Sequence, residues 1–168
     1  QNIIREEMNA VGGNEILMPA MTQESSYKQT GRDKMDILFH LQGRDDSELV
    51  LNPTHEEVVT PLAQKYTFSY RDLPVAVYQI QNKFRNEPRA KSGLLRGREF
   101  NMKDMYSFHV SKESVDEYYE KVKQAYFKVY ERLGIGDITV LTYASGGMFS
   151  KYSHEFQTMA DVGEDTIF

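Results

Sequence analysis

The sequence predicts an α+β fold in which an antiparallel β-sheet is flanked by helices. Two alternating stretches, Val75 to Glu87 and Arg98 to Phe108, are separated by a short polar loop, which is typical of paired antiparallel strands. A long helical pattern follows from Ser111 to Leu133. Strands joined by tight loops favour an α+β layer over a doubly wound sheet. With 168 residues, 40% of them hydrophobic, the chain can bury one core, so we expect a single domain.

The first predicted elements are a helix and a short strand. Gly12 and Gly13 can end the helix, since glycine readily adopts the conformations found after helix C-termini. Residues Glu15 to Pro19 predict a short strand that the proline closes. The helix carries a partial apolar stripe formed by Ile3, Ile4, Met8 and Val11.

A hairpin and a second helix come next. Ile37 to Leu41 and Leu49 to Leu51 flank the polar turn Gln42 to Glu48, a pattern typical of two paired strands. Thr54 to Tyr66 predicts a helix. Thr54 and Glu57 have the spacing of a capping box, in which the two side chains accept backbone N–H groups at the helix start.

The two long strands share a polar face. A period of two places on one face of the first strand the residues Val75, Val77, Gln79, Gln81, Lys83, Arg85 and Glu87. The second strand contributes Arg98, Phe100, Met102, Asp104, Tyr106 and Phe108. Such a face is either the floor of a site or a solvated sheet surface. The residue types favour a site, because arginine clamps phosphate and an aromatic ring stacks on a base.

The last predicted elements are a long helix and two strands. Ser111 caps the helix and Gly134 ends it. Its apolar residues recur at spacings of three and four, which indicates core packing rather than a cofactor site: Val115, Tyr118, Tyr119, Val122, Tyr126, Val129, Tyr130 and Leu133. Strands are expected from Ile138 to Tyr143 and from Ser153 to Ala160.

The loop between the long strands reverses the charge of the chain. The formal net charge is -5, yet six cations and the single acid Glu87 lie between positions 83 and 98. The cations are Lys83, Arg85, Arg89, Lys91, Arg96 and Arg98. This reversal indicates an anionic partner. The acidic balance of the whole chain argues against bulk nucleic-acid binding, which needs many Lys and Arg residues.

Composition excludes several other classes. The chain has no cysteine, so it has neither disulfides nor thiolate metal ligands. His154 and Glu155 have no second histidine-rich element at ligand spacing, so we expect no metal site on the protein. No apolar run reaches the length of a membrane span and no secretory signal is visible, so we expect a cytoplasmic protein without a membrane partner.

Residues 84–109 carry the most specific motif. Phe84-Arg85-Asn86-Glu87, the loop Pro88 to Leu95, and the stretch from Arg96 to His109 resemble the second signature motif of class II aminoacyl-tRNA synthetases. The form is that of the bacterial-type prolyl enzymes, whereas threonyl, seryl and glycyl relatives differ after Arg-Glu-Phe. The resemblance implies the class II catalytic fold, ATP-dependent activation of L-proline, and transfer of proline to the acceptor end of tRNA(Pro).

The resemblance also assigns nucleotide contacts. Arg85 would bridge the proline carboxylate and the α-phosphate as the catalytic residue. Glu87 would read the adenine amine, Phe100 would stack on the ring, and Arg96 would hold the outer phosphates. The six cations then form a triphosphate clamp, and Mg²⁺ would arrive with ATP.

Further family motifs imply a proline pocket. Asn52 to Glu57 resembles the Thr-x-Glu loop, so Thr54 and Glu56 would bind the proline nitrogen, with the helix start leaving Glu56 free. His55 receives no role. A pocket would be completed by Met102, Asp104, Tyr106 and His154, the last from a Ser-His-Glu-Phe element at 153–156. A lone histidine and an ordinary Gly146-Gly147 turn are the alternatives there.

The N-terminal residues resemble the first class II motif, in which Pro19 would lie at a homodimer interface; an ordinary edge-strand proline is the alternative. We find no third motif, insertion or editing domain, or anticodon-binding domain. We therefore expect residues 1–168 to be one partial catalytic core with little activity alone. A non-catalytic paralogue and a threonyl- or seryl-type synthetase are the alternative functions.

Overall fold

The computed structural model describes residues 1–145, 153–163 and 166. Its helices are α1 (Asn2–Ala10), α2 (Glu24–Thr30), α3 (Glu56–Tyr66) and α4 (Lys112–Arg132), with short 3-10 turns η1 (Tyr70–Asp72) and η2 (Gly136–Ile138). Its strands are β1 (Asn14–Glu15), β2 (Met21–Gln23), β3 (Phe39–Gln42), β4 (Glu48–Leu51), β5 (Val75–Phe84), β6 (Glu99–Phe108), β7 (Thr139–Ala144) and β8 (Ser153–Thr158). The predicted α+β class is confirmed.

The centre of the fold is the hairpin formed by β5 and β6. The strands pair antiparallel over ten residues each, from Val75 opposite Phe108 to Phe84 opposite Glu99. This register places Gln79 beside Asp104, so the shared polar face predicted from the period of two is confirmed. One short pairing departs from the antiparallel pattern, because β1 pairs parallel with the outer edge of β5.

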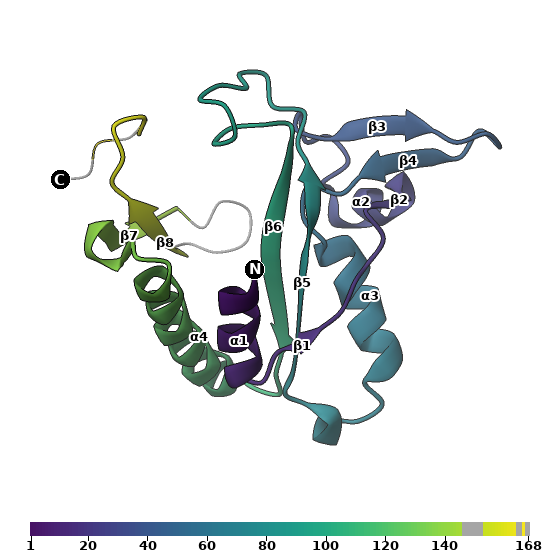
Figure 1. Cartoon of the computed structure of the whole chain (residues 1–168). Helices are drawn as coiled ribbons and strands as arrows, with labels where there is room; N and C mark the ends of the chain where they lie inside the picture. Colours follow the sequence, from purple (N-terminus) through teal and green to yellow (C-terminus); the bar gives the residue numbers. More distant parts are fainter. Residues whose placement is uncertain (146–152, 164–165, 167–168) are drawn as a thin grey trace.

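Helices cover both faces of this hairpin. Figure 1 shows α1 and α4 together on one side of β5 and β6, with α3 on the other. On the first side Tyr78 packs against Met8, Val11 and Ala125 to form the main core. Gly13 is required there, because a Cβ at this position would lie 2.9 Å from Met105 Cε and 3.0 Å from the Met8 carbonyl oxygen.

A second small sheet, in the order β2-β4-β3, lies at one end of the hairpin. The predicted hairpin of β3 and β4 is confirmed, with its first strand shifted to residues 39–42. The sequence analysis missed β2 and α2. Tyr27 on α2 is fully buried against Leu38 and Val50, so one aromatic residue anchors an otherwise polar helix.

The caps of the longer helices differ from one another. Ser111 accepts the N–H of Ser114 at the start of α4, as predicted. Helix α3 begins at Glu56 with His55 as its N-cap and no side-chain cap bond, so the predicted Thr54–Glu57 capping box is wrong. Both side chains of that pair bind Arg32 instead.

The C-terminal strands β7 and β8 form an antiparallel pair beside α4, close to the predicted ranges. The predicted strand 15–19 is shorter than expected, because β1 ends at Glu15 and only Ile16 adds one more backbone bond to Tyr78. None of the helices in the described part of the chain is both long and apolar enough to cross a bilayer.

Candidate active site on the polar face of the hairpin

Ionised and amide side chains gather where the start of α3 faces the polar side of β5 and β6. Gln79, Lys83 and Asp104 come from the strands and are all buried. His55, also buried, comes from the segment that leads into α3. The start of α3 and the hairpin therefore meet at a polar interface, and every buried charge there needs a partner.

Lys83 and Asp104 form a buried ion pair. Lys83 Nζ lies 2.8 Å from Asp104 Oδ1, and the lysine side chain is 0% exposed. Burial lowers the pKa of Lys83, while Asp104 opposes that shift. The other carboxylate oxygen, Oδ2, accepts hydrogen bonds from Gln79 Nε2 (3.0 Å) and from the Tyr106 hydroxyl (2.7 Å). Lys83 is thus committed to Asp104, and its inclusion in a six-cation phosphate clamp is wrong.

His55, which received no role from the sequence, ties the start of α3 to this pair. Its Nδ1 accepts from Lys83 Nζ at 2.5 Å and its Nε2 donates to the Pro19 carbonyl at 2.9 Å. Its backbone N–H donates to the Tyr106 hydroxyl at 2.8 Å. Burial and the Lys83 charge lower the pKa of His55, so the ring is neutral with its proton on Nε2.

A second buried ion pair lies beside the same segment. Arg32 Nη1 donates to both oxygens of Glu57, at 2.9 and 3.0 Å, and the two side chains are 6% and 1% exposed. The guanidinium also donates to Thr54 Oγ1 (3.1 Å) and to Glu56 Oε2 (3.2 Å). The expectation that the helix start leaves Glu56 free is therefore wrong, although its side chain is still 35% exposed.

Arg85 lies at the end of the same strand face. Its guanidinium carbon lies 5.2 Å from the centre of the Phe100 ring. Burial lowers the pKa of Arg85, and the carboxylates of Glu56 and Glu87 oppose that shift. Apart from Asp104 Oδ1, which is paired with the Lys83 charge, two buried atoms on this face, Arg85 Nε and Gln81 Oε1, have no hydrogen-bond partner in the described part of the chain. Buried polar atoms without partners are uncommon in folded proteins and indicate a place where a ligand binds.

When the charged side chains of the site are paired, two of them have no counter-charge of their own. Arg32 cancels Glu57 and Lys83 cancels Asp104. What remains is one carboxylate, Glu56, and one guanidinium, Arg85. These two groups influence each other electrostatically, since the Glu56 charge raises the pKa of Arg85 against the effect of burial. A site with one surplus charge of each sign complements a zwitterion.

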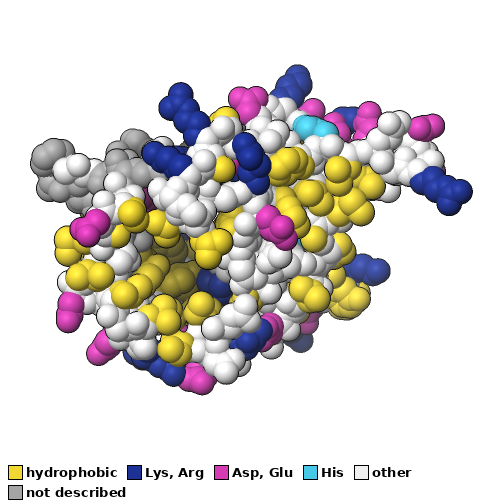
Figure 2. Space-filling view, turned by 45° about the horizontal axis from the view of Figure 1, so that its top comes forward, with side chains coloured by type: hydrophobic (Ala, Val, Ile, Leu, Met, Phe, Trp, Pro, Cys, Tyr) yellow, Lys and Arg dark blue, Asp and Glu magenta, His cyan; other side chains and the backbone are white. Residues whose placement is uncertain are grey.

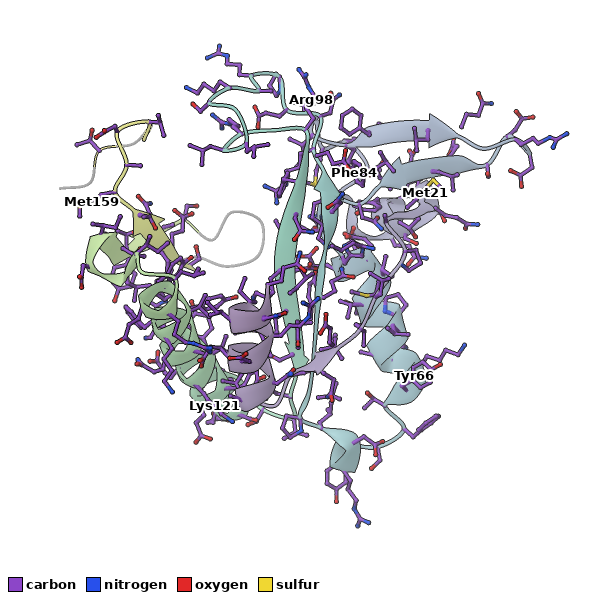
Figure 3. The ribbon with its side chains drawn as sticks, in the orientation of Figure 1. Met21, Tyr66, Phe84, Arg98, Lys121 and Met159 are labelled. Carbon is purple, nitrogen blue, oxygen red and sulfur yellow. The ribbon has the colours of Figure 1, made fainter. Side chains whose placement is uncertain are left out.

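The loop after β5 brings the remaining cations to this end of the hairpin. Arg96 Nε lies 3.5 Å from Glu87 Oε2, and Arg98 Nε donates to the Glu87 carbonyl at 3.0 Å. Arg98 stands where the loop rejoins β6 (Figure 3). Figure 2 shows Lys and Arg side chains next to hydrophobic ones on the face turned toward the viewer. Glu87, expected to read an adenine amine, is bound within its own loop.

The structure does not bring every predicted residue to this site. Phe100, Met102, Asp104 and Tyr106 share the face as expected. His154 lies on β8, where its Nδ1 is 2.9 Å from the Tyr119 hydroxyl and its ring centre 4.9 Å from that of Tyr143. No contact among the described residues joins it to the polar site, so its role in proline binding stays a prediction. Gly146 and Gly147 lie outside the described residues.

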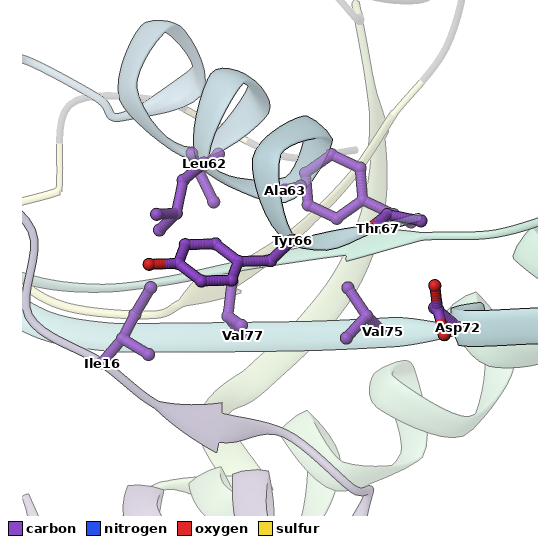
Figure 4. A pocket seen from close by; sticks show the side chains of 10 residues that line it. Ile16, Leu62, Ala63, Tyr66, Thr67, Asp72, Val75 and Val77 are labelled. Atoms are coloured by element: carbon purple, nitrogen blue, oxygen red, sulfur yellow. The ribbon is translucent and has the colours of Figure 1, made fainter. Parts of the chain in front are cut away.

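A separate pocket of about 350 Å³ lies between α3 and the lower part of β5. Figure 4 shows Leu62, Ala63 and Tyr66 of the helix over Val75 and Val77 of the strand. Its one carboxylate, Asp72, already accepts the N–H groups of residues 68 and 69. An apolar pocket of this kind does not fit a zwitterion, so the polar site remains the candidate.

No group of three or more His, Cys, Asp or Glu side chains within the described ranges is arranged to hold a metal ion. Sequence reasoning missed Arg32 as part of the site, and it assigned Lys83 to the phosphate clamp instead of to Asp104. The one local signal for Arg32 is its place directly after Gly31, the glycine that ends α2 with a φ of 71°.

Comparison with known proteins agrees with this geometry. Residues 39–166 match the family of the tRNA synthetase class II core domain (G, H, P, S and T). The chain is 52% identical to a proline–tRNA ligase of Dehalococcoides mccartyi over 99% of the chain and 30% of that protein. It is 47% identical to the proline–tRNA ligase of Geobacillus thermodenitrificans over 98% of the chain and 29% of that protein.

A solved structure shows the same fold. The Giardia lamblia prolyl-tRNA synthetase in complex with prolyl-adenylate superposes with a TM-score of 0.73 at 24% identity, over 78% of this chain and 28% of that one. The chain thus spans about 30% of the length of the curated relatives that it matches. The match across residues 39–166 shows that the chain belongs to the class II tRNA synthetase core domain family.

Proposed function

We propose that this chain forms the proline- and ATP-binding part of a proline–tRNA ligase. The whole reaction would be ATP-dependent activation of L-proline to prolyl-adenylate, followed by ligation of proline to tRNA(Pro). The names of the relatives support this function, and the observation that carries it is the surplus pair of charges, Glu56 and Arg85, beside the buried orphan atom Arg85 Nε.

A free amino acid fits this pair. At neutral pH proline carries one positive nitrogen and one negative carboxylate. Its nitrogen would donate to Glu56 and Thr54, and its carboxylate would accept from Arg85. Met102, Asp104 and Tyr106 would form the floor beneath the ring. We keep His154 as a proposed pocket residue on the basis of the Ser-His-Glu-Phe element alone.

The chemistry needs alignment more than proton transfer. A carboxylate oxygen of proline attacks the α-phosphorus, the bond from that phosphorus to the pyrophosphate oxygen breaks, and pyrophosphate leaves. No proton moves in this step, because the carboxylate is already ionised. Arg85 would hold both anions in line and neutralise the charge that develops, which is the main contribution a protein makes to such a transfer.

The nucleotide would lie along the loop end of the hairpin. Phe100, already in contact with Arg85, would stack on the adenine, and Glu87 would accept its amine after exchanging its bond to Arg96. Arg96 is the proposed partner of the outer phosphates. Mg²⁺ bound to the triphosphate oxygens would neutralise charge on the leaving pyrophosphate.

Three further parts of the proposal concern partners and place. The acceptor end of tRNA(Pro) would receive the proline, with release of AMP. Pro19 and the first motif would lie at a homodimer interface; in this chain the Pro19 carbonyl accepts from His55 and Asn52. The protein would act in the cytoplasm.

A thermal-shift panel tests the proposal with the chain itself. The prolyl sulfamoyl-adenosine analogue of the adenylate is expected to raise the melting temperature, while the threonyl and seryl analogues are not. Arg85→Met should weaken binding of the prolyl analogue about 10- to 100-fold, the value of a hydrogen bond to a charged group. Equal stabilisation by all three analogues, or none by any, would contradict the proposed substrate.

A further inference from the structure

We infer that Arg32, neutralised by Glu57, is the positioning residue that prepares Thr54 and Glu56 for the ammonium group of the substrate. The inference rests on the proposed function and deepens it. Arg32 follows the end of α2, more than twenty positions before both acceptors in the sequence. Its guanidinium donates to Thr54 Oγ1 at 3.1 Å and to Glu56 Oε2 at 3.2 Å.

The contacts of Arg32 decide which atoms remain for the substrate. Glu56 gives Oε2 to the guanidinium, and its Oε1 accepts no hydrogen bond within the described residues. Thr54 Oγ1 accepts the Arg32 N–H with one lone pair, and its second lone pair can accept another donor. The site therefore offers two fixed acceptors, and a secondary ammonium carries two N–H donors. A primary ammonium carries three, so one donor would stay unpaired, a mismatch that binding sites penalise.

Glu57 makes this arrangement possible. A guanidinium beside Glu56 would by itself cancel the charge that attracts the ammonium. Glu57 instead takes two hydrogen bonds from Arg32 Nη1 in a nearly fully buried pair, and Thr30 Oγ1 donates to the same carboxylate at 2.9 Å. Arg32 thus acts as a rigid donor whose charge is already balanced, and Glu56 keeps its negative charge for the substrate.

The packing around Arg32 fixes its direction. The guanidinium carbon lies 6.0 Å from the centre of the buried Tyr27 ring, and Nε lies 3.4 Å from Met35 Sδ. The Tyr27 hydroxyl donates to Asn52 and to the Thr54 carbonyl, which holds the same segment from a second direction. A side chain packed this way has little freedom, as positioning of a site requires.

The test compares two ligands that differ only at the nitrogen. Isothermal titration of the chain would measure L-proline and (S)-tetrahydrofuran-2-carboxylate, in which an ether oxygen replaces the ammonium. Arg32→Met with Glu57→Met removes both buried charges together, which avoids leaving one of them unpaired. We expect this double variant to lose about tenfold in proline affinity with no change for the ether.

Control variants and outcomes separate the alternatives. Arg44→Met, at an exposed position of the β3–β4 turn, should bind both ligands as the unsubstituted chain does. Arg32→Lys keeps the charge and should recover part of the proline affinity. An equal loss for both ligands, or no loss, overturns the inference and leaves the proposed function standing. Failure of the unsubstituted chain to bind proline overturns the proposed function instead.

Discussion

Replacing Lys83 by methionine is expected to destabilise the fold strongly. The substitution keeps most of the side-chain volume and removes only the charge. It leaves the Asp104 carboxylate, 9% exposed, without its counter-ion at 2.8 Å, and it leaves His55 Nδ1 without a donor. Breaking a buried pair from one side costs about 3–5 kcal/mol, which is a large part of the roughly 5–15 kcal/mol that stabilises a typical domain.

Urea denaturation followed by circular dichroism measures this loss. With an m-value of about 2 kcal/mol/M, the midpoint for Lys83→Met should fall by about 2 M. Adding Asp104→Asn removes the stranded charge while an amide oxygen still accepts from Gln79 and Tyr106, so the double variant should recover a large part of the loss. Lys112→Met breaks an exposed pair with Asp116 and should leave the midpoint unchanged.

Two results would refute this reasoning. A midpoint for Lys83→Met as high as that for Lys112→Met would mean that the buried pair contributes no more than a surface pair. A double variant no more stable than Lys83→Met would mean that the stranded Asp104 charge is not the cause of the loss.

Three other predictions concern acid stability, packing and turnover. Stability should decrease below about pH 6.5 because the pKa of His55 is lowered by burial, and His55→Gln should reduce this slope in urea melts across pH 7.5 to 5. Gly13→Ala should cost about 1–3 kcal/mol because its Cβ would meet Met105 and the Met8 carbonyl, whereas Gly97→Ala, with one contact of 3.3 Å to the Glu99 carbonyl oxygen, should cost less by the same assay. In pyrophosphate exchange the 168-residue chain should be far slower than a full-length relative, since it spans about 30% of such proteins.

The sign for His55 follows from proton counting. In the unfolded chain the imidazole binds a proton near pH 6.5, while the buried ring does so only at lower pH. Between these values the unfolded state holds more protons, so stability falls as the pH falls, by at most about 1.4 kcal/mol per unit. An unchanged slope in His55→Gln, equal costs for both glycine variants, or exchange at the rate of a full-length relative would each contradict its prediction.

Much of the fold was predictable because its elements are regular. The ten-residue strands β5 and β6 alternate cleanly, and α4 has both a helical apolar stripe and a serine cap. The pairing of β1 was not predictable, since a two-residue parallel contact leaves no pattern in the sequence. Helix α2 was missed for a similar reason, because its seven residues contain one buried side chain, Tyr27.

The sequence predicted which residues lie on the face of the site, but it did not predict their interaction partners. Alternation placed Asp104 and Arg85 on the face that carries the site. Local spacing gave the wrong partner for Thr54 and Glu57, because a buried guanidinium from a distant segment competes successfully with backbone N–H groups for both side chains. The count of cations near the loop likewise included Lys83, whose partner lies 21 positions further along the chain.

The docking of α1 and β1 has a consequence for synthesis. These elements leave the ribosome before β5, β6 and α4, yet β1 pairs with Val77 and Tyr78, and Glu7 of α1 accepts from Arg132 at 2.7 Å. The hairpin of β5 and β6 closes through a much shorter loop, which favours its earlier formation. We therefore expect α1 to remain undocked during translation until α4 has emerged, so that this helix is made before the hairpin and docks after it.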